Sequence, residues 1–304
     1  MAKKHKSQTS GEAPTEEGGF VPYAPRSRTR VALDVLTVVL GTGAAIVVVD
    51  WFFGKAALPI IRPAFLGLLH AIAAYGILWA LLVRPKRYHA DALGLAVSLA
   101  TVGRAAIGFC FGGALAALAV GVAVLARGLE LHRAPSWQAP SAVEVVIWIA
   151  TAFFGAIFEE LVFRSGTVGT LRTAYPRAVA LIVPGVIFAL GHVSNPYISP
   201  LAIANTVLAG VFLGLLFLHP RNDPTVPGLG LPVGAHAGWN LALRLLGVPV
   251  SGFVAQGRYV QLFSVNDTWS GGAYGVEGGL AGSIAIGIGA GVVYWDMRRR
   301  SESA

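Results

Sequence analysis

The sequence predicts an all-α protein, a polytopic transmembrane bundle of about eight helices. Of its 304 residues, 55% are hydrophobic and only 12% are charged, whereas soluble proteins carry about 25% charged residues. The apolar residues fall into runs of about 20, the length that a helix needs to cross a bilayer. The basic residues form no patch interleaved with aromatic side chains, which argues against a nucleic-acid partner. The lipid bilayer is therefore the expected surrounding of most of the chain.

Residues 1–30 precede the first apolar run and combine Lys and Arg with Ser, Thr, Glu and Pro. They offer too little apolar surface to fold, so we expect a disordered cytoplasmic tail. No apolar core follows the first lysines, and the first run begins only at Val31, which excludes a signal peptide there. A transmembrane domain is expected over 31–297, followed by a short cytoplasmic tail over 298–304.

Eight apolar runs give the expected spans, of which the seventh is the shortest. Residues 84–104 are expected at the membrane interface, and residues 248–278, rich in Gly and polar groups, form the longest loop. No internal repeat is visible, which argues against a transporter built from inverted repeats. The expected spans are 31–53, 64–83, 105–126, 142–163, 178–195, 200–218, 233–247 and 279–296.

The distribution of positive charge predicts the orientation. Lys and Arg collect in cytoplasmic loops of membrane proteins. With the N-terminus inside, 16 of the 23 Lys and Arg residues lie on the cytoplasmic side, including Arg164, and five lie outside. The sequence therefore predicts a multi-pass protein of the cell membrane with both termini in the cytoplasm.

Two adjacent acidic residues, Glu159 and Glu160, lie near the end of the fourth apolar run. Ionisable residues inside a bilayer are costly and are functional by default. Glu160 and Arg164 are four residues apart and can pair along one helix face, which leaves Glu159 free for other work. The structural alternative is a helix-end ion pair with Glu159 reaching the interface.

Three further polar residues lie in the next spans. His192 ends the fifth run, and His236 and Asn240 lie one turn apart on one face of the seventh, flanked by Gly and Ala. His and Asn so placed can donate hydrogen bonds to one oxygen, as an oxyanion site requires. The alternatives are a hydrogen-bonded core histidine and polar contacts between helices.

Together these residues suit either amide hydrolysis or metal binding by carboxylate and imidazole. No His-Glu-x-x-His, Gly-x-Ser-x-Gly or Gly-x-Gly-Asp motif is present, and the single cysteine, Cys110, excludes disulfides and Cys-ligated metals.

Asp34 and Asp50 lie near opposite ends of one span and are expected to be helix-end residues. Glu277, in the late loop, is a lesser candidate. His70, His89, His132 and His219 lack spaced partners and are expected to be structural or exposed, and Arg104 is expected at a helix end.

Three motifs in this order, Glu159-Glu160-x-x-x-Arg164, Phe188-x-x-x-His192 and His236-x-x-x-Asn240, resemble the signatures of the CPBP family. This family is also called the ABI or type II CAAX prenyl endopeptidase (Rce1-like) family. The resemblance covers a protease core of about 141–247.

The resemblance implies an α-helical intramembrane endopeptidase that acts on a membrane-associated or membrane-spanning peptide or protein. It implies that Glu159 activates water with His192, that His236 and Asn240 hold the oxyanion, and that Glu160 and Arg164 support the site. It leaves open whether a divalent metal such as zinc takes part, with Glu159, His192 and His236 as the ligands.

Two other functions stay open. A non-catalytic membrane adaptor or immunity protein would keep the polar cluster only to bind a peptide. An ion or proton transporter would need a path of ionisable residues across the membrane, whereas Glu159 and Glu160 are the only acids well inside the expected spans.

For the three motifs to come together, the boundaries of the fourth and fifth spans must differ from those of the apolar runs. A fourth span ending at Phe163 would leave its acids near the cytoplasmic face, while His192 lies late in the returning fifth span. We expect the helix to continue past Gly166 to about Thr173 and the fifth span to begin near Ala180. Pro184 can kink the fifth span.

Overall fold

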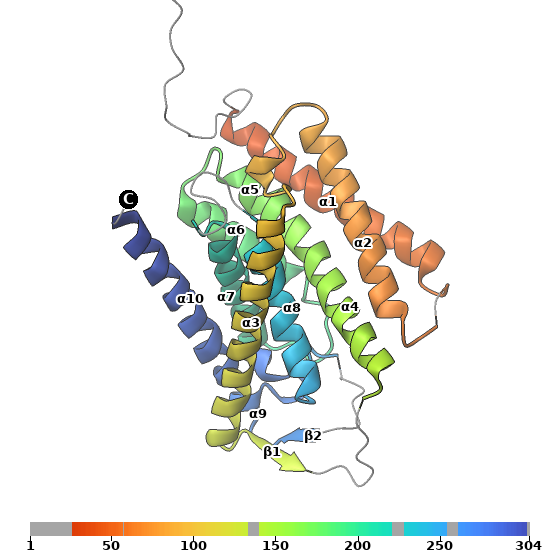
Figure 1. The fold of residues 1–304 in the computed structure, drawn as a ribbon, viewed down its shortest axis with the longest axis vertical. Helices are drawn as coiled ribbons and strands as arrows, with labels where there is room; N and C mark the ends of the chain where they lie inside the picture. The colour runs from red at the N-terminus through yellow and green to blue at the C-terminus, as the bar shows by residue number, and fades with distance from the viewer. Residues whose placement is uncertain (1–25, 57, 133–139, 221–227, 254–260, 303–304) are drawn as a thin grey trace, which may run out of the picture.

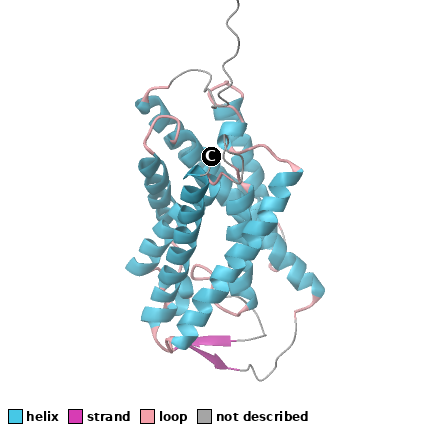
Figure 2. Cartoon of the chain, turned by 60° about the vertical axis from the view of Figure 1, so that its left-hand side comes forward, coloured by secondary structure: helices cyan, strands magenta, loops and turns pink. Residues whose placement is uncertain are grey.

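The computed structural model describes residues 26–56, 58–132, 140–220, 228–253 and 261–302, which form a bundle of long helices closed at one end by two short strands (Figures 1 and 2). The first half contains α1 (Arg28–Phe53), α2 (Arg62–Leu78), the π-helical η1 (Trp79–Val83), η2 (Asp91–Leu93), α3 (Leu99–Leu125) and β1 (Leu129–His132). The second half contains α4 (Ala142–Glu160), the π-helical η3 (Leu161–Val168), α5 (Gly169–Leu171), α6 (Arg177–Leu190), α7 (Pro200–Phe217), α8 (Gly230–Leu245), β2 (Gln261–Ser264), α9 (Asp267–Ser270), η4 (Gly272–Tyr274), η5 (Val276–Gly278) and α10 (Leu280–Glu302).

Each of the eight expected spans is present as a helix. Six of the described helices are long and apolar enough to cross a membrane. The helices at the fifth and seventh expected spans, α6 and α8, have 14 and 16 residues and are shorter than a full crossing needs. The all-α polytopic bundle is thus confirmed, and the chain is a membrane protein. The six long helices are Arg28–Phe53, Arg62–Val83, Leu99–Leu125, Ala142–Leu171, Pro200–Phe217 and Leu280–Glu302.

The short helix α8 runs through the middle of the bundle, against α3 and α4 (Figure 1). Its contact with α3 depends on small residues. A Cβ atom added at Gly112 of α3 would lie 1.9 Å from the backbone oxygen of Ala235 in α8. Two helices that touch backbone to backbone in this way fix the position of the residue after Ala235, which is His236.

The fourth span continues beyond Phe163, as the position of its acids predicts. Helical structure runs without a break from Ala142 to Leu171, and Leu161–Val168 form a π-helical segment. The expected end near Thr173 is close to the observed end, but α6 begins at Arg177, three residues before the expected start.

The continued helix corrects the sequence-based placement of Arg164. The charge count places Arg164 on the cytoplasmic side, but its side chain is fully buried inside the bundle. The physical reason is that η3 prolongs α4, so Arg164 lies one turn beyond Glu160 and pairs with it.

One end of the bundle holds the start of α1, the segment that joins α2 to α3, and the end of α10; the two strands close the opposite end (Figure 1). Asp34 near the start of α1 is buried and accepts hydrogen bonds from Arg87 Nη1 and the Tyr88 hydroxyl, each at 2.9 Å. Burial, and then the charge of Asp34, raises the pKa of Tyr88 above its ordinary range. Tyr88 therefore stays a neutral donor, and Asp34 fastens α1 to the segment after α2.

Two of the four histidines expected to be structural have carboxylate partners. His70 Nε2 lies 3.0 Å from Asp50, and His219 Nε2 lies 3.2 Å from Asp296. The segment 248–278, expected to form the longest loop, contains β2, which pairs antiparallel with β1, and three short helical segments. The side chain of His132 and residues 1–25 of the expected N-terminal tail lie outside the described residues, whereas residues 298–302 of the expected C-terminal tail continue α10.

Candidate active site

The two glutamates lie where α4 widens into the π-helical η3, a feature often found at functional sites. Glu160 and Arg164 are both fully buried, and the Nε atom of Arg164 lies 2.8 Å from Oε2 of Glu160. The spacing of four residues predicts this pair. Because an unpaired guanidinium is costly inside a membrane, Glu160 is held in place as the counter-ion of Arg164.

His236 of α8 joins this pair. Its Nδ1 atom lies 2.9 Å from Oε1 of Glu160. A carboxylate only accepts hydrogen bonds, so Nδ1 carries the proton. The other ring nitrogen, Nε2, lies 3.7 Å from Oε2 of Glu159. Both oxygens of Glu160 are therefore occupied, whereas Glu159, with 25% of its side chain exposed, stays more open.

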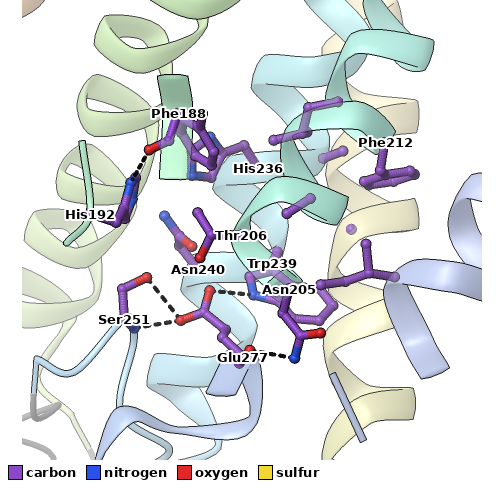
Figure 3. A pocket seen from close by; sticks show the side chains of 15 residues that line it. Phe188, His192, Asn205, Thr206, Phe212, His236, Trp239, Asn240, Ser251 and Glu277 are labelled. Atoms are coloured by element: carbon purple, nitrogen blue, oxygen red, sulfur yellow. Dashed lines mark hydrogen bonds between the residues drawn. The ribbon is translucent and has the colours of Figure 1, made fainter. Parts of the chain in front are cut away.

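His192 lies in the turn directly after α6. Its Nδ1 atom is 2.8 Å from the backbone oxygen of Phe188, which is the hydrogen bond drawn in Figure 3. A carbonyl oxygen can only accept, so Nδ1 carries a proton. Nε2 is the nitrogen left for another partner, and without a proton its lone pair can accept a hydrogen bond.

The ring of Phe188 packs against Arg164 and against both site histidines. Its ring centre lies 4.5 Å from that of His192 and 6.2 Å from that of His236, and Arg164 Cζ lies 4.9 Å from it. The sequence motif includes Phe188, but sequence reasoning gives it no role. Its ring contacts both histidines and the guanidinium of Arg164.

A cavity of about 60 Å³ lies beside these residues, with room for several water molecules. His192, His236 and Asn240 all line it, as Figure 3 shows. Sequence reasoning missed four of the other polar residues around it: Asn205, Thr206, Trp239 and Ser251. Two of these gave a signal, because Asn205 and Thr206 are polar residues in an apolar span.

Glu277 also lines the cavity and brings a carboxylate directly to it. Its side chain accepts a hydrogen bond of 2.9 Å from Trp239 Nε1 and two more from Ser251 (Figure 3). Nearby, burial and then the charge of Glu277 raise the pKa of Tyr274, so its phenol stays protonated.

The six predicted site residues thus form two groups that share one member. Glu159, Glu160, Arg164 and His236 form an ionic cluster, whereas His192, His236 and Asn240 line the cavity. Glu159 does not line the cavity, and it forms its ion pair with His236.

The three expected metal ligands do not gather around one point. Within the described ranges, no three His, Cys, Asp or Glu side chains are close enough together to hold a metal ion. His236 and Glu159 approach each other, but the nearest further carboxylate, Glu160, is taken up by Arg164. The arrangement therefore does not fit a three-ligand metal site.

The fold and the site define a class: a polytopic helical membrane protein with acid–base groups and hydrogen-bond donors gathered inside the bundle. Residues 141–242 match the sequence model of the family described as type II CAAX prenyl endopeptidase Rce1-like. This segment runs from the N-cap of α4 into α8 and contains all six site residues. The match supports membership of the CPBP family and, with it, a protease of the CAAX endopeptidase kind. No curated protein sequence matches the chain.

Proposed function

We propose that this protein is an intramembrane endopeptidase that hydrolyses a peptide bond in the cavity between α7 and α8. The observation that carries the proposal is the double position of His236. It pairs with the two glutamates and also lines the cavity with His192 and Asn240. His236 thus joins the glutamates to a space that has room for water.

Glu159 is the proposed general base, because it is the glutamate whose oxygens are not both occupied. It takes a proton from water as the water oxygen bonds to the carbonyl carbon of the peptide. His192 Nε2 accepts a hydrogen bond from the second hydrogen of that water and orients it. When the C–N bond breaks, Glu159 returns the proton to the leaving amine.

Asn240 and His236 are the proposed donors to the oxyanion of the tetrahedral intermediate. Asn240 donates through its amide, and His236 donates through Nε2 when both ring nitrogens carry protons. The Nδ1 proton is committed to Glu160, so Nε2 is the nitrogen that faces Glu159 and the cavity side. The Glu160–Arg164 pair acts by holding His236.

The substrate is proposed to be a membrane-associated peptide or protein, and the family description makes a prenylated CAAX peptide the first probe. The protein is proposed to lie in the cell membrane with both termini in the cytoplasm. The charge distribution of the sequence supports this orientation, and so does the position of the start of α1 and the end of α10 at the same end of the bundle (Figure 1).

The test is turnover of a quenched fluorescent prenylated CAAX peptide by the purified protein in lipid nanodiscs. Glu159→Gln removes the base at nearly constant volume, so we expect a loss of about 10² to 10⁴ in rate. Glu302→Gln changes an exposed carboxylate at the end of α10 and serves as the matched control. Equal, measurable turnover by wild type and Glu159→Gln would contradict the role of Glu159. No turnover by the wild type would favour a peptide-binding protein without catalysis.

A further inference from the structure

Glu277 lies outside the segment that matches the family model, residues 141–242, but its carboxylate lines the cavity. Oε1 accepts from Trp239 Nε1 at 2.9 Å, and Oε2 accepts from both the backbone N–H and the hydroxyl of Ser251, the latter at 3.0 Å. These partners are neutral donors, in contrast to the cationic partners of Glu160. Three hydrogen bonds to one carboxylate fix its position.

The two residues that donate hydrogen bonds to Glu277 are each connected to a residue that lines the proposed catalytic cavity: Trp239 to Asn240, and Ser251 to His192. Trp239 directly precedes Asn240 in α8. Ser251 accepts, through its backbone oxygen, a hydrogen bond of 3.1 Å from Asn195 Nδ2. The backbone N–H of Asn195 in turn donates to the backbone oxygen of His192 at 2.9 Å. A continuous chain of hydrogen bonds and one peptide bond therefore links His192 to Asn240 through Glu277.

Backbone contacts of the neighbouring residue, Gly252, fix the turn that contains Ser251. Gly252 has φ 86°, and a Cβ atom there would lie 2.1 Å from the backbone oxygen of Pro196, close to Asn195 in the turn after α6. On the other side, the Gly252 N–H donates to the Tyr274 backbone oxygen at 2.9 Å. Close contact on both sides keeps Ser251 between the His192 turn and the segment of Glu277.

The Glu277 backbone is fixed as well. Its carbonyl oxygen accepts from Asn205 Nδ2 of α7 at 2.8 Å, and Asn205 Oδ1 accepts from the Ser283 hydroxyl of α10 at 2.7 Å. The carboxylate therefore projects from a rigid support. A rigid support matters because displacement of a reacting group by about 1 Å can lower a rate about 10²-fold.

We propose that Glu277 is a positioning residue that sets Asn240 relative to His192 across the cavity, a role that rests on the proposed endopeptidase function. It acts through Trp239 and Ser251 and takes no proton from the substrate. The acceptor-only chemistry of the carboxylate is essential, because each oxygen faces a donor. In Glu277→Gln, the new NH₂ group would face Trp239 Nε1–H or the two donors of Ser251.

The test measures kcat and KM for the prenylated CAAX peptide with Glu277→Gln, Asn240→Ala and the double variant in nanodiscs. We expect Glu277→Gln to lower kcat about 10- to 100-fold and to change KM less than about threefold. Because Glu277 acts through Asn240, adding Glu277→Gln to Asn240→Ala should lower kcat by less than about threefold more. Asp267→Asn, an exposed carboxylate of the same late segment, is the control and should retain the wild-type values.

Several outcomes would overturn the role. Fully additive losses in the double variant would show that Glu277 does not act through Asn240. A raised KM with unchanged kcat would make Glu277 a substrate-binding group. If Glu277→Gln unfolds, Ser251→Ala replaces it, since it removes only the hydroxyl donor, and a kcat unchanged within experimental error would then contradict the proposal. Glu159→Gln, measured in parallel, separates the two claims: an active Glu159→Gln refutes the proposed function, whereas an inactive Glu159→Gln with a fully active Glu277→Gln refutes only the positioning role.

Discussion

Nδ1 of His236 lies 2.9 Å from Oε1 of Glu160, which joins two residues 76 positions apart in the sequence. This contact, together with the ion pair to Arg164, occupies both oxygens of Glu160 and leaves Glu159 as the open carboxylate. The two adjacent glutamates, which look alike in the sequence, thus have different surroundings. The difference supports a structural role for Glu160 and a chemical role for Glu159.

Loss of the charge on Glu160 should destabilise the fold. In Glu160→Gln the buried guanidinium of Arg164 loses its counter-ion, which typically costs about 3–5 kcal/mol. The double variant Glu160→Gln/Arg164→Met should recover most of this free energy of unfolding because no buried charge is left unpaired. Turnover should stay low, since His236 loses the negative charge that supports its doubly protonated ring. Reversible unfolding and turnover of the same preparations provide the measurement, and a double variant as unstable as Glu160→Gln would count against the ion-pair account.

The contact between α3 and α8 should tolerate no side chain at Gly112. Gly112→Ala would place a methyl group against the backbone of Ala235, and we expect a loss of about 1–3 kcal/mol with reduced turnover, because His236 must shift. The neighbour Gly113 is the matched control, since a Cβ atom there meets nothing closer than 3.7 Å. Gly113→Ala should be neutral or more stable by up to about 1 kcal/mol. Equal thermal stability of the two variants would contradict this packing.

Metal removal should leave turnover unchanged. The expected ligands Glu159, His192 and His236 do not gather in the described part of the chain, so we expect dialysis against a chelator to retain activity. The measurement combines turnover with the metal content of the wild type and His236→Ala. Loss of activity on chelation, restored by zinc, together with loss of bound metal in His236→Ala, would establish the metal-dependent mechanism instead.

The predicted orientation can be tested with single cysteines at Ser7, Lys86 and Ser303 in a Cys110→Ala background. We expect an impermeant thiol reagent to label none of the three in intact cells and all three after permeabilisation. Labelling of any of them from outside would show that this end of the bundle is not cytoplasmic.

Much of the fold could be predicted because a bilayer leaves few choices. Apolar runs of sufficient length must form helices there, and the eight predicted runs correspond to α1, α2, α3, α4, α6, α7, α8 and α10. The π-helical geometry of η3 could not be predicted, because the sequence 161–168 is equally compatible with an ordinary helix.

The motif residues of the site could also be named from the sequence, since buried ionisable residues stand out in apolar spans. Their pairing could not, because it depends on contacts between helices: Glu160 rather than Glu159 binds His236 Nδ1. Ser251 and Glu277 lie in a segment without a motif, and only the fold brings them to the cavity. The sequence therefore indicates Glu277 only as a lesser candidate and does not indicate Ser251 at all.

The most direct test of the central claim compares the membrane peptides of cells that produce the wild-type protein with those of cells that produce Glu159→Gln at the same level. Mass spectrometry of newly formed peptide ends detects cleavage of any membrane protein, whatever its sequence. New peptide ends are expected with the wild type and with Glu302→Gln, and they should be absent with Glu159→Gln. Identical sets of peptide ends in wild type and Glu159→Gln would contradict an endopeptidase that depends on this glutamate.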